Sequence, residues 1–303
     1  PTEMLKDRDD DYQTTVQFLR LCLRGRWEPA AAEAAAGQSA AGRVDWPAAC
    51  RAAEREGVAP LLYQITRDWG PAAGLPQAAG EQLRRAYMGT ARRNAILFSE
   101  LERILPALAG AGAPVILLKG AALAGAVYGN IAVRPMADLD LLVREKDLPA
   151  ALGALPALGY EITPPLVYRS EVMLLRAIGA ERALVELHWS LLIPPYYHYN
   201  GLLDWAWQTA LPAAAGPGSG SARMLGPEAQ VLHLCGHLQW HHPGASEVRQ
   251  LWLHDVAEVI ARYRDEIDWD RLLACAQEYD LVLPAQRTIG RVAADYWGHL
   301  GEG

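Results

Sequence analysis

The hydrophobic pattern of this chain changes period near residue 110, and this change limits the folds that the chain can adopt. Before that point, apolar residues recur at the three- and four-residue intervals of amphipathic helices. Residues 115–118 and 138–143 are instead short apolar or alternating runs, which predict strands. Helical spacing returns after about residue 196. We therefore expect a compact α/β unit with helical regions before and after it.

The pattern divides the 303 residues into three regions. They are an N-terminal helical region, an α/β core and a C-terminal helical region, at residues 1–108, 109–195 and 196–303. Three further strands are expected in the core, with a turn at Gly179 between the last two: residues 160–163, 172–178 and 183–189.

Composition excludes several classes of protein. Hydrophobic residues make up 51% and charged residues 21%, which excludes a disordered or coiled-coil chain. A net charge of −7 provides no general phosphate-binding surface and argues against long nucleic acid as a partner. The four cysteines have no CxxC spacing, and no apolar run is long enough to span a bilayer. We expect a soluble cytoplasmic protein with no membrane partner and reduced thiols.

The segment Asp138-Leu139-Asp140 is the first candidate site. On a strand, residues i and i+2 point to one face, so the two carboxylates would stand side by side. Carboxylate oxygens suit Mg²⁺, and a shared pair can hold two ions where a phosphoryl group is transferred. About one such pair is expected by chance in a chain of this size, so the surrounding motifs decide its weight.

A strand that runs through Lys119-Gly120 into a helix precedes this pair. A glycine turn at a helix N-terminus offers backbone N–H groups to a phosphate, and Lys119 adds a positive charge. The alternative is an ordinary strand–helix turn. Arg134, four residues before Asp138, either reaches a phosphate or anchors its loop to an acidic neighbour.

A third motif is the run from Leu184 to Trp189, on which Glu186 and His188 share one face of a strand. Glu186 could complete a metal site or deprotonate the hydroxyl of an acceptor. Alternatively it is a solvated glutamate on a half-exposed strand.

Together these motifs resemble the nucleotidyltransferase superfamily that includes DNA polymerase β, and more closely one bacterial branch of it. The similarity spans about residues 46–260 and rests on these segments: Gly57–Tyr63, Leu117–Ala121, Arg134, Asp138–Val143, Leu158–Tyr160, Glu186–Trp189 and Leu251–Asp255. The superfamily turn is usually Gly-Gly or Gly-Ser, whereas this chain has Lys119-Gly120.

The resemblance implies an α+β fold in which a small mixed-sheet nucleotidyltransferase core is flanked by helices. By motif, Asp138, Asp140 and Glu186 would be the catalytic residues and hold Mg²⁺ or Mn²⁺. The residues expected to face the NTP are Lys119, Gly120, Arg134, His188 and His237.

His233, His237 and His241 lie four residues apart, along one face of a predicted helix. Such a row could bind a transition metal, and with His254-Asp255 it resembles a helical metal phosphohydrolase. The bacterial branch shares the His237/His241 spacing, which favours a wall of the active site. Helix packing or surface exposure is the other interpretation.

We expect a Mg²⁺-dependent nucleotidyltransferase that moves an NMP from an NTP to a hydroxyl or phosphate of an unidentified acceptor. The acceptor could be a small molecule, a peptide or a protein, and pyrophosphate is released. The first alternative is a non-catalytic module that senses nucleotides or binds a protein on the same fold. The second is a metal phosphohydrolase built on the histidine helices.

Overall fold

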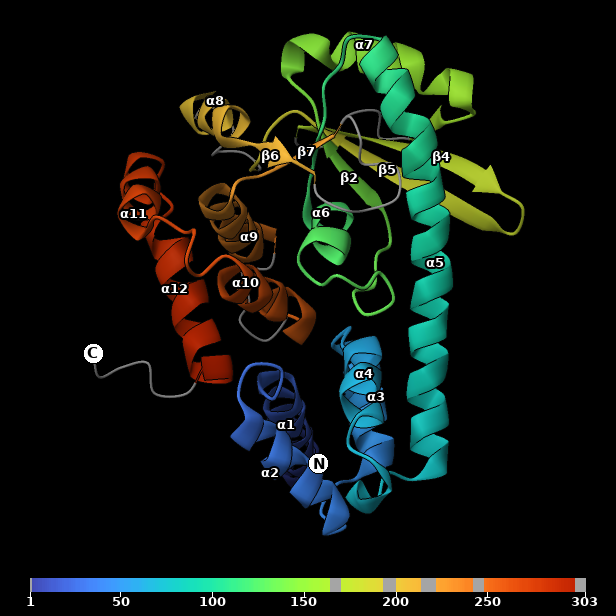
Figure 1. Cartoon of the computed structure of the whole chain (residues 1–303), viewed down its shortest axis with the longest axis vertical. Coiled ribbons are helices and arrows are strands. Elements are labelled where there is room, and N and C mark those ends of the chain that lie inside the picture. The colour runs from blue at the N-terminus through green and yellow to red at the C-terminus, as the bar shows by residue number, and fades with distance from the viewer. Residues whose placement is uncertain (1, 164–169, 193–199, 214–221, 242–247, 298–303) are drawn as a thin grey trace.

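The structure is a computed structural model in which one sheet lies among many helices (Figure 1). The described residues are 2–163, 170–192, 200–213, 222–241 and 248–297. For residues 2–11, 200, 240 and 241 only the backbone is described.

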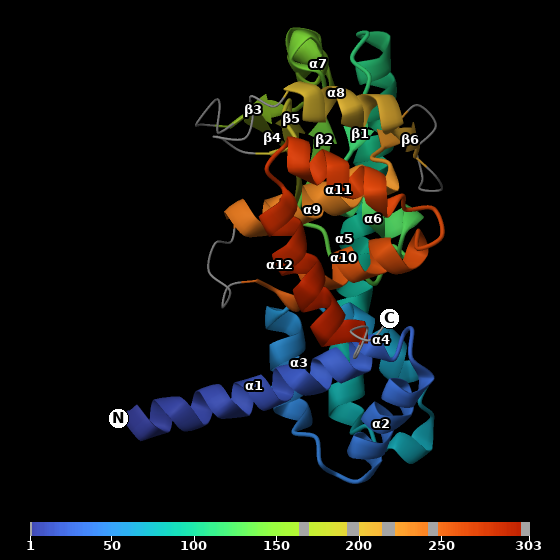
Figure 2. The ribbon, with the colours of Figure 1, turned by 90° about the vertical axis from the view of Figure 1, so that its left-hand side faces the viewer.

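Five α-helices precede the sheet in the described chain. They are α1 (Thr2–Arg24), α2 (Pro29–Ala40), α3 (Trp46–Arg55), α4 (Ala59–Arg67) and α5 (Gln77–Gly110). Helix α1 extends away from the rest of the molecule, as Figure 2 shows. Helix α5 has 34 residues, so it is about 51 Å long at 1.5 Å per residue. It runs from the other N-terminal helices to the sheet (Figure 1).

The described strands form one mixed sheet with the order β3-β4-β5-β2-β1-β7-β6. Their bounds are β1 (Ile116–Leu117), β2 (Leu139–Leu142), β3 (Glu161–Ile162), β4 (Glu171–Ile178), β5 (Glu181–His188), β6 (Leu211–Pro212) and β7 (Arg223–Met224). Strand β1 is antiparallel to β2, and β2 is parallel to β5. The predicted α+β class and mixed sheet are therefore confirmed. Two strands at one end of the sheet, β7 and the edge strand β6, come from the region after residue 195.

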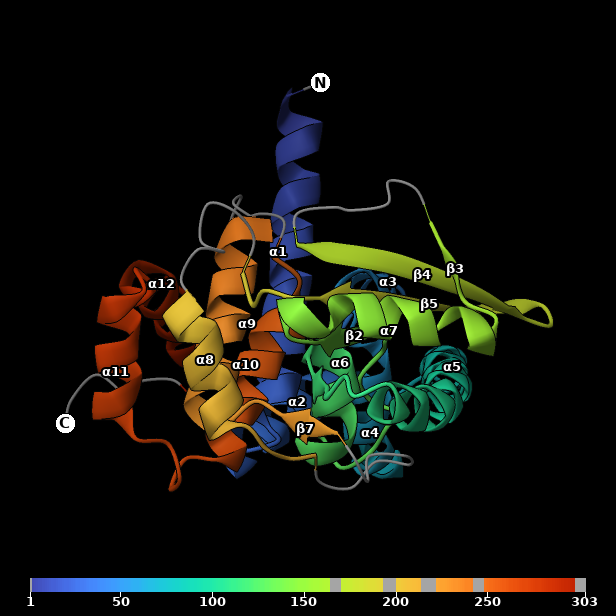
Figure 3. The ribbon, with the colours of Figure 1, turned by 90° about the horizontal axis from the view of Figure 1, so that it is seen from above.

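The remaining α-helices surround this sheet. They are α6 (Lys119–Ala126), α7 (Leu148–Ala154), α8 (Asn200–Thr209), α9 (Pro227–His241), α10 (Gln250–Arg262), α11 (Trp269–Glu278) and α12 (Val282–Val292). Short 3₁₀ turns lie at Pro71–Ala73, Glu145–Asp147 and Pro156–Leu158, and a π turn at Ala293–Trp297. Helices α9 and α10 lie between α12 and α6 (Figures 1 and 3). Within the described chain, no helix combines the length and apolarity needed to cross a bilayer.

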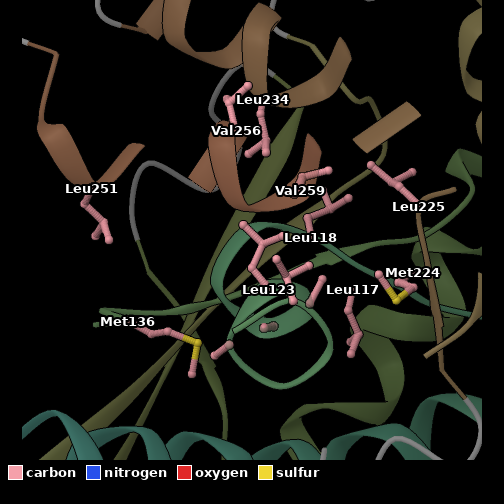
Figure 4. Packing of buried hydrophobic residues seen from close by; sticks show 14 of the residues in the cluster. Leu117, Leu118, Leu123, Met136, Met224, Leu225, Leu234, Leu251, Val256 and Val259 are labelled. Atoms are coloured by element: carbon pink, nitrogen blue, oxygen red, sulfur yellow. The ribbon is translucent and has the colours of Figure 1, made fainter. Parts of the chain in front are cut away.

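One hydrophobic core joins the sheet, α6 and α10. Leu118 and Leu123 lie in one cluster with Val256 and Val259 of α10, as Figure 4 shows. All four side chains are almost fully buried. Burial of each contributes about 1.5–3 kcal/mol to folding. The C-terminal helices thus support the turn at which α6 begins.

Helix α5 fixes the loop between α6 and β2. Asn94 donates from Nδ2 to two backbone carbonyl oxygens of this loop, at 2.6 and 2.8 Å. Arg93 donates to the carbonyl oxygen of Ala137 at 2.6 Å. Because Asp138 follows Ala137 directly, these bonds set the position at which the paired aspartates begin.

Candidate active site

The turn between β1 and α6 is held in an unusual backbone conformation. Lys119 has a φ of 41°, in the left-handed region that residues other than glycine seldom adopt. This conformation costs about 1–3 kcal/mol, so the surrounding packing must maintain it. A Cβ on Gly120 would lie 2.7 Å from Cγ of Met136 and would also collide with the Arg134 guanidinium. Any larger residue at position 120 would therefore force Met136 and Arg134 to shift.

The parallel pairing of β2 with β5 brings the predicted acidic residues together. Asp140 is the register partner of Glu186. Asp140, Glu186 and His188 each offer a ligand atom within 4.8 Å of the other two. Asp138 lies two residues before Asp140 and outside this group. The structure thus joins three of the predicted site residues and places the fourth beside them.

Two cations already contact Asp140. Lys119 donates from Nζ to its Oδ1 at 2.7 Å, and Nε2 of His188 lies 3.1 Å from the same oxygen. Burial alone would raise the pKa of Asp140, but these two neighbours hold it well below its usual range. Asp140 is therefore an ionised carboxylate in an almost fully buried position.

The imidazole of His188 lies among three carboxylates. Besides Asp140, its Nδ1 is 3.2 Å from Glu171 and its Nε2 is 3.6 Å from Glu186. Burial favours the neutral ring, yet hydrogen bonds to the carboxylates outweigh it and raise the pKa of His188 to about 10. His188 is therefore positively charged at neutral pH.

Asp138 has the opposite electrostatic environment. Burial, followed by the negative charges of Asp140 and Glu186, raises its pKa to about 7. Lys119 opposes this rise but does not cancel it. Negative charge therefore remains in excess where the carboxylates meet, and an added cation would relieve the repulsion.

The donor set fits a hard divalent ion. The carboxylates of Asp140 and Glu186, with Asp138 adjacent, provide the oxygen ligands that Mg²⁺ and Mn²⁺ prefer. An imidazole suits Mg²⁺ less well, and His188 is charged and bound to carboxylates. We therefore regard His188 as a residue that orients the carboxylates.

Arg134 binds an acidic neighbour, which was one of its two expected roles. Its Nη2 lies 2.8 Å from Oδ2 of Asp255 on α10, and both side chains are buried. Tyr128 donates to the other oxygen of the same carboxylate at 2.7 Å. The guanidinium thus fixes the loop before β2 to α10, directly beneath Gly120.

Two of the histidines on α9 lie beside one another. The rings of His233 and His237 are 6.3 Å apart. Nδ1 of His233 is 3.0 Å from the carbonyl oxygen of Leu191, just beyond β5. Burial and the positive charges of Lys119 and His188 lower the pKa of His233 to about 3. These observations place His233, in the middle of α9, at the edge of the acidic site.

His254 lies elsewhere, on α10. Its Nε2 is 3.2 Å from Glu258, and its ring packs against Trp27 and Tyr296. Among the residues whose side chains are described, only Asp140, Glu186 and His188 could hold a metal as a group of three. The side chain of His241 lies outside the description. The described histidine helices thus provide no metal site for a phosphohydrolase.

Glu171 is a member of the site that the sequence analysis missed. It begins β4 and is the register partner of His188 on β5. The predicted turn at Gly179 contained the necessary signal, because a tight hairpin centred there pairs residue 171 with residue 188. Glu171 belongs to no recognisable motif, so nothing in its immediate sequence marks it as a site residue.

The three predicted carboxylates lie close together next to the glycine turn, as we expect for a nucleotidyltransferase. The chain belongs to the family described as "Uncharacterised nucleotidyltransferase", whose sequence model matches residues 42–296. The family predicted from the motifs is therefore confirmed. No curated protein matches the chain.

Two solved structures are similar to this chain. One is the solution structure of the antibiotic-resistance factor ANT(2'')-Ia, with 12% identity and a TM-score of 0.43. The similarity covers 65% of this chain and 98% of that one. The other is an antigenic nucleotidyltransferase-like protein from Paracoccidioides brasiliensis, with 15% identity and a TM-score of 0.38. This second similarity covers 63% of this chain and 92% of the Paracoccidioides brasiliensis chain.

Proposed function

We propose that the protein is a Mg²⁺- or Mn²⁺-dependent nucleotidyltransferase that uses an NTP. The pairing of Asp140 with Glu186 across parallel strands, at the foot of the Lys119-Gly120 turn, supports this proposal most strongly. The acceptor oxygen would form a bond to the α-phosphorus while the bond from that phosphorus to the bridging oxygen breaks. Pyrophosphate then leaves, and the hydroxyl proton passes to a carboxylate of the site.

The side chains have separate roles in this reaction. Asp140 and Glu186 would hold the divalent ion, which supplies positive charge for the attacking and leaving oxygens. Asp138, whose pKa is raised to about 7, is suited to accept the hydroxyl proton. Lys119, which contacts Asp140 beside the turn, would supply positive charge to the phosphates.

Calorimetric titration with each of the four NTPs, with and without Mg²⁺, tests the donor site. We expect Mg²⁺-dependent binding of at least one NTP and its loss in Asp138→Ala/Asp140→Ala. Asp265→Ala/Asp270→Ala removes two exposed carboxylates of the C-terminal region, one between α10 and α11 and one on α11, and is the matched control. Equal binding by the wild type and the site variant would overturn the proposal.

A non-catalytic nucleotide sensor is the second candidate. The ion pair between Lys119 and Asp140 favours it, because this pair occupies a carboxylate that catalysis needs. A sensor would bind Mg²⁺-NTP without releasing pyrophosphate with any acceptor. Release that depends on Asp140 would exclude it.

A further inference from the structure

A cavity of about 430 Å³ lies where the N-terminal helices meet the loop before β2. One side is formed by the start of α4 and the middle of α5, and the other by Pro135 and Met136. Figure 1 shows this loop beside α5 and above the end of α4. Arg249, directly before α10, completes the rim.

The cavity lies close to the chain that carries the acidic site. Met136 lines the cavity, and its Sδ lies 2.9 Å from the position that a Cβ on Gly120 would take. Asp138 follows two residues later. Two residues of chain span at most about 7 Å, so the Cα atom of Asp138 lies no farther than that from the Cα atom of Met136 on the cavity wall.

Part of the lining is small and apolar, and it includes Ala59, Ala86 and Gly89. Two polar groups on the lining residues lack partners in the described chain. The guanidinium of Arg249 contacts the ring of Trp252 and forms no ion pair with a described carboxylate. Asn94 is fully buried and its Oδ1 has no hydrogen bond.

The guanidinium of Arg249 and the amide oxygen of Asn94 differ in what they can bind. A guanidinium binds carboxylate or phosphate, often with two hydrogen bonds. An amide oxygen accepts a hydrogen bond, and so selects a hydroxyl or an amine. Arg93 also lines the cavity, but its guanidinium is bound to backbone carbonyl oxygens and so holds the wall in place.

From this arrangement we infer that the cavity binds the acceptor, a small hydroxyl-bearing molecule with a carboxylate or phosphate group. The inference rests on the proposed function and adds the acceptor class to it. The anionic group would bind Arg249, and a hydroxyl would bind Asn94 while another approaches Asp138. A volume of about 430 Å³ suits a hydroxy acid or a sugar phosphate, since ligand pockets usually measure about 300–1,000 Å³.

The first test fills the cavity. A Cβ at residue 89 meets no atom within 4 Å, so Gly89→Leu places a side chain in open space. Leucine also favours the helix more than glycine does, so the fold is retained. Gly290→Leu on α12 is the matched control, because it too meets no atom.

The second test removes the charge. Arg249→Ala is compared with Arg249→Lys and with Arg84→Ala, which changes an exposed arginine of α5 outside the cavity. The probes are ribose 5-phosphate, glycerol 3-phosphate and glycerate, with ribose, glycerol and glucosamine as neutral and cationic counterparts. Each is titrated by calorimetry without nucleotide and then assayed with Mg²⁺-NTP for pyrophosphate release.

We expect at least one anionic probe to bind and to stimulate release, with its uncharged counterpart about tenfold weaker. Arg249→Ala should weaken that probe about tenfold and Gly89→Leu should abolish its binding, while NTP affinity is unchanged. The inference is overturned if no anionic probe binds, if glucosamine is preferred, or if both cavity variants bind like wild type. Absence of NTP binding by the wild type would instead refute the proposed function. The titrations without nucleotide test the cavity separately.

Discussion

Two buried groups of charged side chains lie near the loop between α6 and β2. They differ in how well positive charge matches negative charge. Next to α10, Arg134 and Tyr128 satisfy Asp255. At the sheet, the carboxylates of Asp138, Asp140, Glu171 and Glu186 lie close to two cations that contact members of the group, Lys119 and His188. A balanced buried pair serves the fold, whereas uncompensated carboxylates create a site that attracts a cation.

Replacement of Asp140 should have the largest effect on the group of carboxylates at the sheet. Asp140→Ala removes the shared ligand, so we expect nucleotidyl transfer to fall about a thousandfold, which corresponds to roughly 4 kcal/mol. Pyrophosphate release with a saturating acceptor measures it. Activity within tenfold of the wild type would show that Asp140 is not a ligand.

The next largest effect is expected at the balanced pair. Arg134→Met leaves Asp255 charged, buried and unpaired, and should lower the free energy of unfolding by about 3–5 kcal/mol. Urea unfolding at neutral pH measures this loss. Arg134→Met/Asp255→Leu should recover most of it, because apolar residues can replace a buried pair. A double variant as unstable as the single one would contradict this account.

Substitution of Asp138 should stabilise the protein, whereas substitution of Arg134 should destabilise it. Its folded pKa of about 7 exceeds the ordinary value of 3.8, so the folded state binds more protons between these pH values. Stability contributed by Asp138 is therefore lost as pH rises from about 4 to 7. In EDTA at pH 8, Asp138→Asn should stabilise the protein by about 2 kcal/mol.

The same urea measurements near pH 4 should show almost no difference between Asp138→Asn and the wild type. Asp265→Asn, at an exposed carboxylate, is the control. It should leave the free energy of unfolding unchanged both at pH 8 and near pH 4. Destabilisation by Asp138→Asn at pH 8 would mean that the negative charge at the sheet is already balanced.

The smallest effect is expected at Gly120, which lies between the two groups. Gly120→Ala forces Met136 and Arg134 to shift. We expect destabilisation of about 1 kcal/mol, at the lower end for overpacking, because both neighbours are flexible side chains. Thermal unfolding measures it, and an unchanged Tm would show that the turn is loosely packed.

Local patterns were sufficient to predict the class of fold and, apart from Glu171, the carboxylates of the acidic site. Alternation along residues 138–143 identified Asp138 and Asp140 as a pair, and the run ending at Trp189 identified Glu186. Both predictions depend on the two-residue period of a strand, which is visible in the sequence itself. The nucleotidyltransferase family and its α+β fold were predicted from the resemblance of these and the other motifs to that superfamily, and both are confirmed.

The contacts that decide what each residue does could not be predicted in the same way. Arg134 had two possible partners in the sequence, and only the packing of α10 against the loop selects Asp255. Asn94 gave no signal on a long amphipathic helix, although it anchors the loop before Asp138. Such contacts join residues far apart in the chain, where no local period applies.

Because helix α5 runs from the N-terminal helices to the sheet, a truncated protein without it would lose contacts that hold the acidic site. A fragment that begins at residue 109 would contain every carboxylate of the acidic site. It would lack Arg93 and Asn94, whose hydrogen bonds hold the loop before β2. It would also lose most of the wall of the cavity beside Met136. The smallest piece with an intact site therefore includes α5, so the N-terminal helices cannot be removed as a separate appendage.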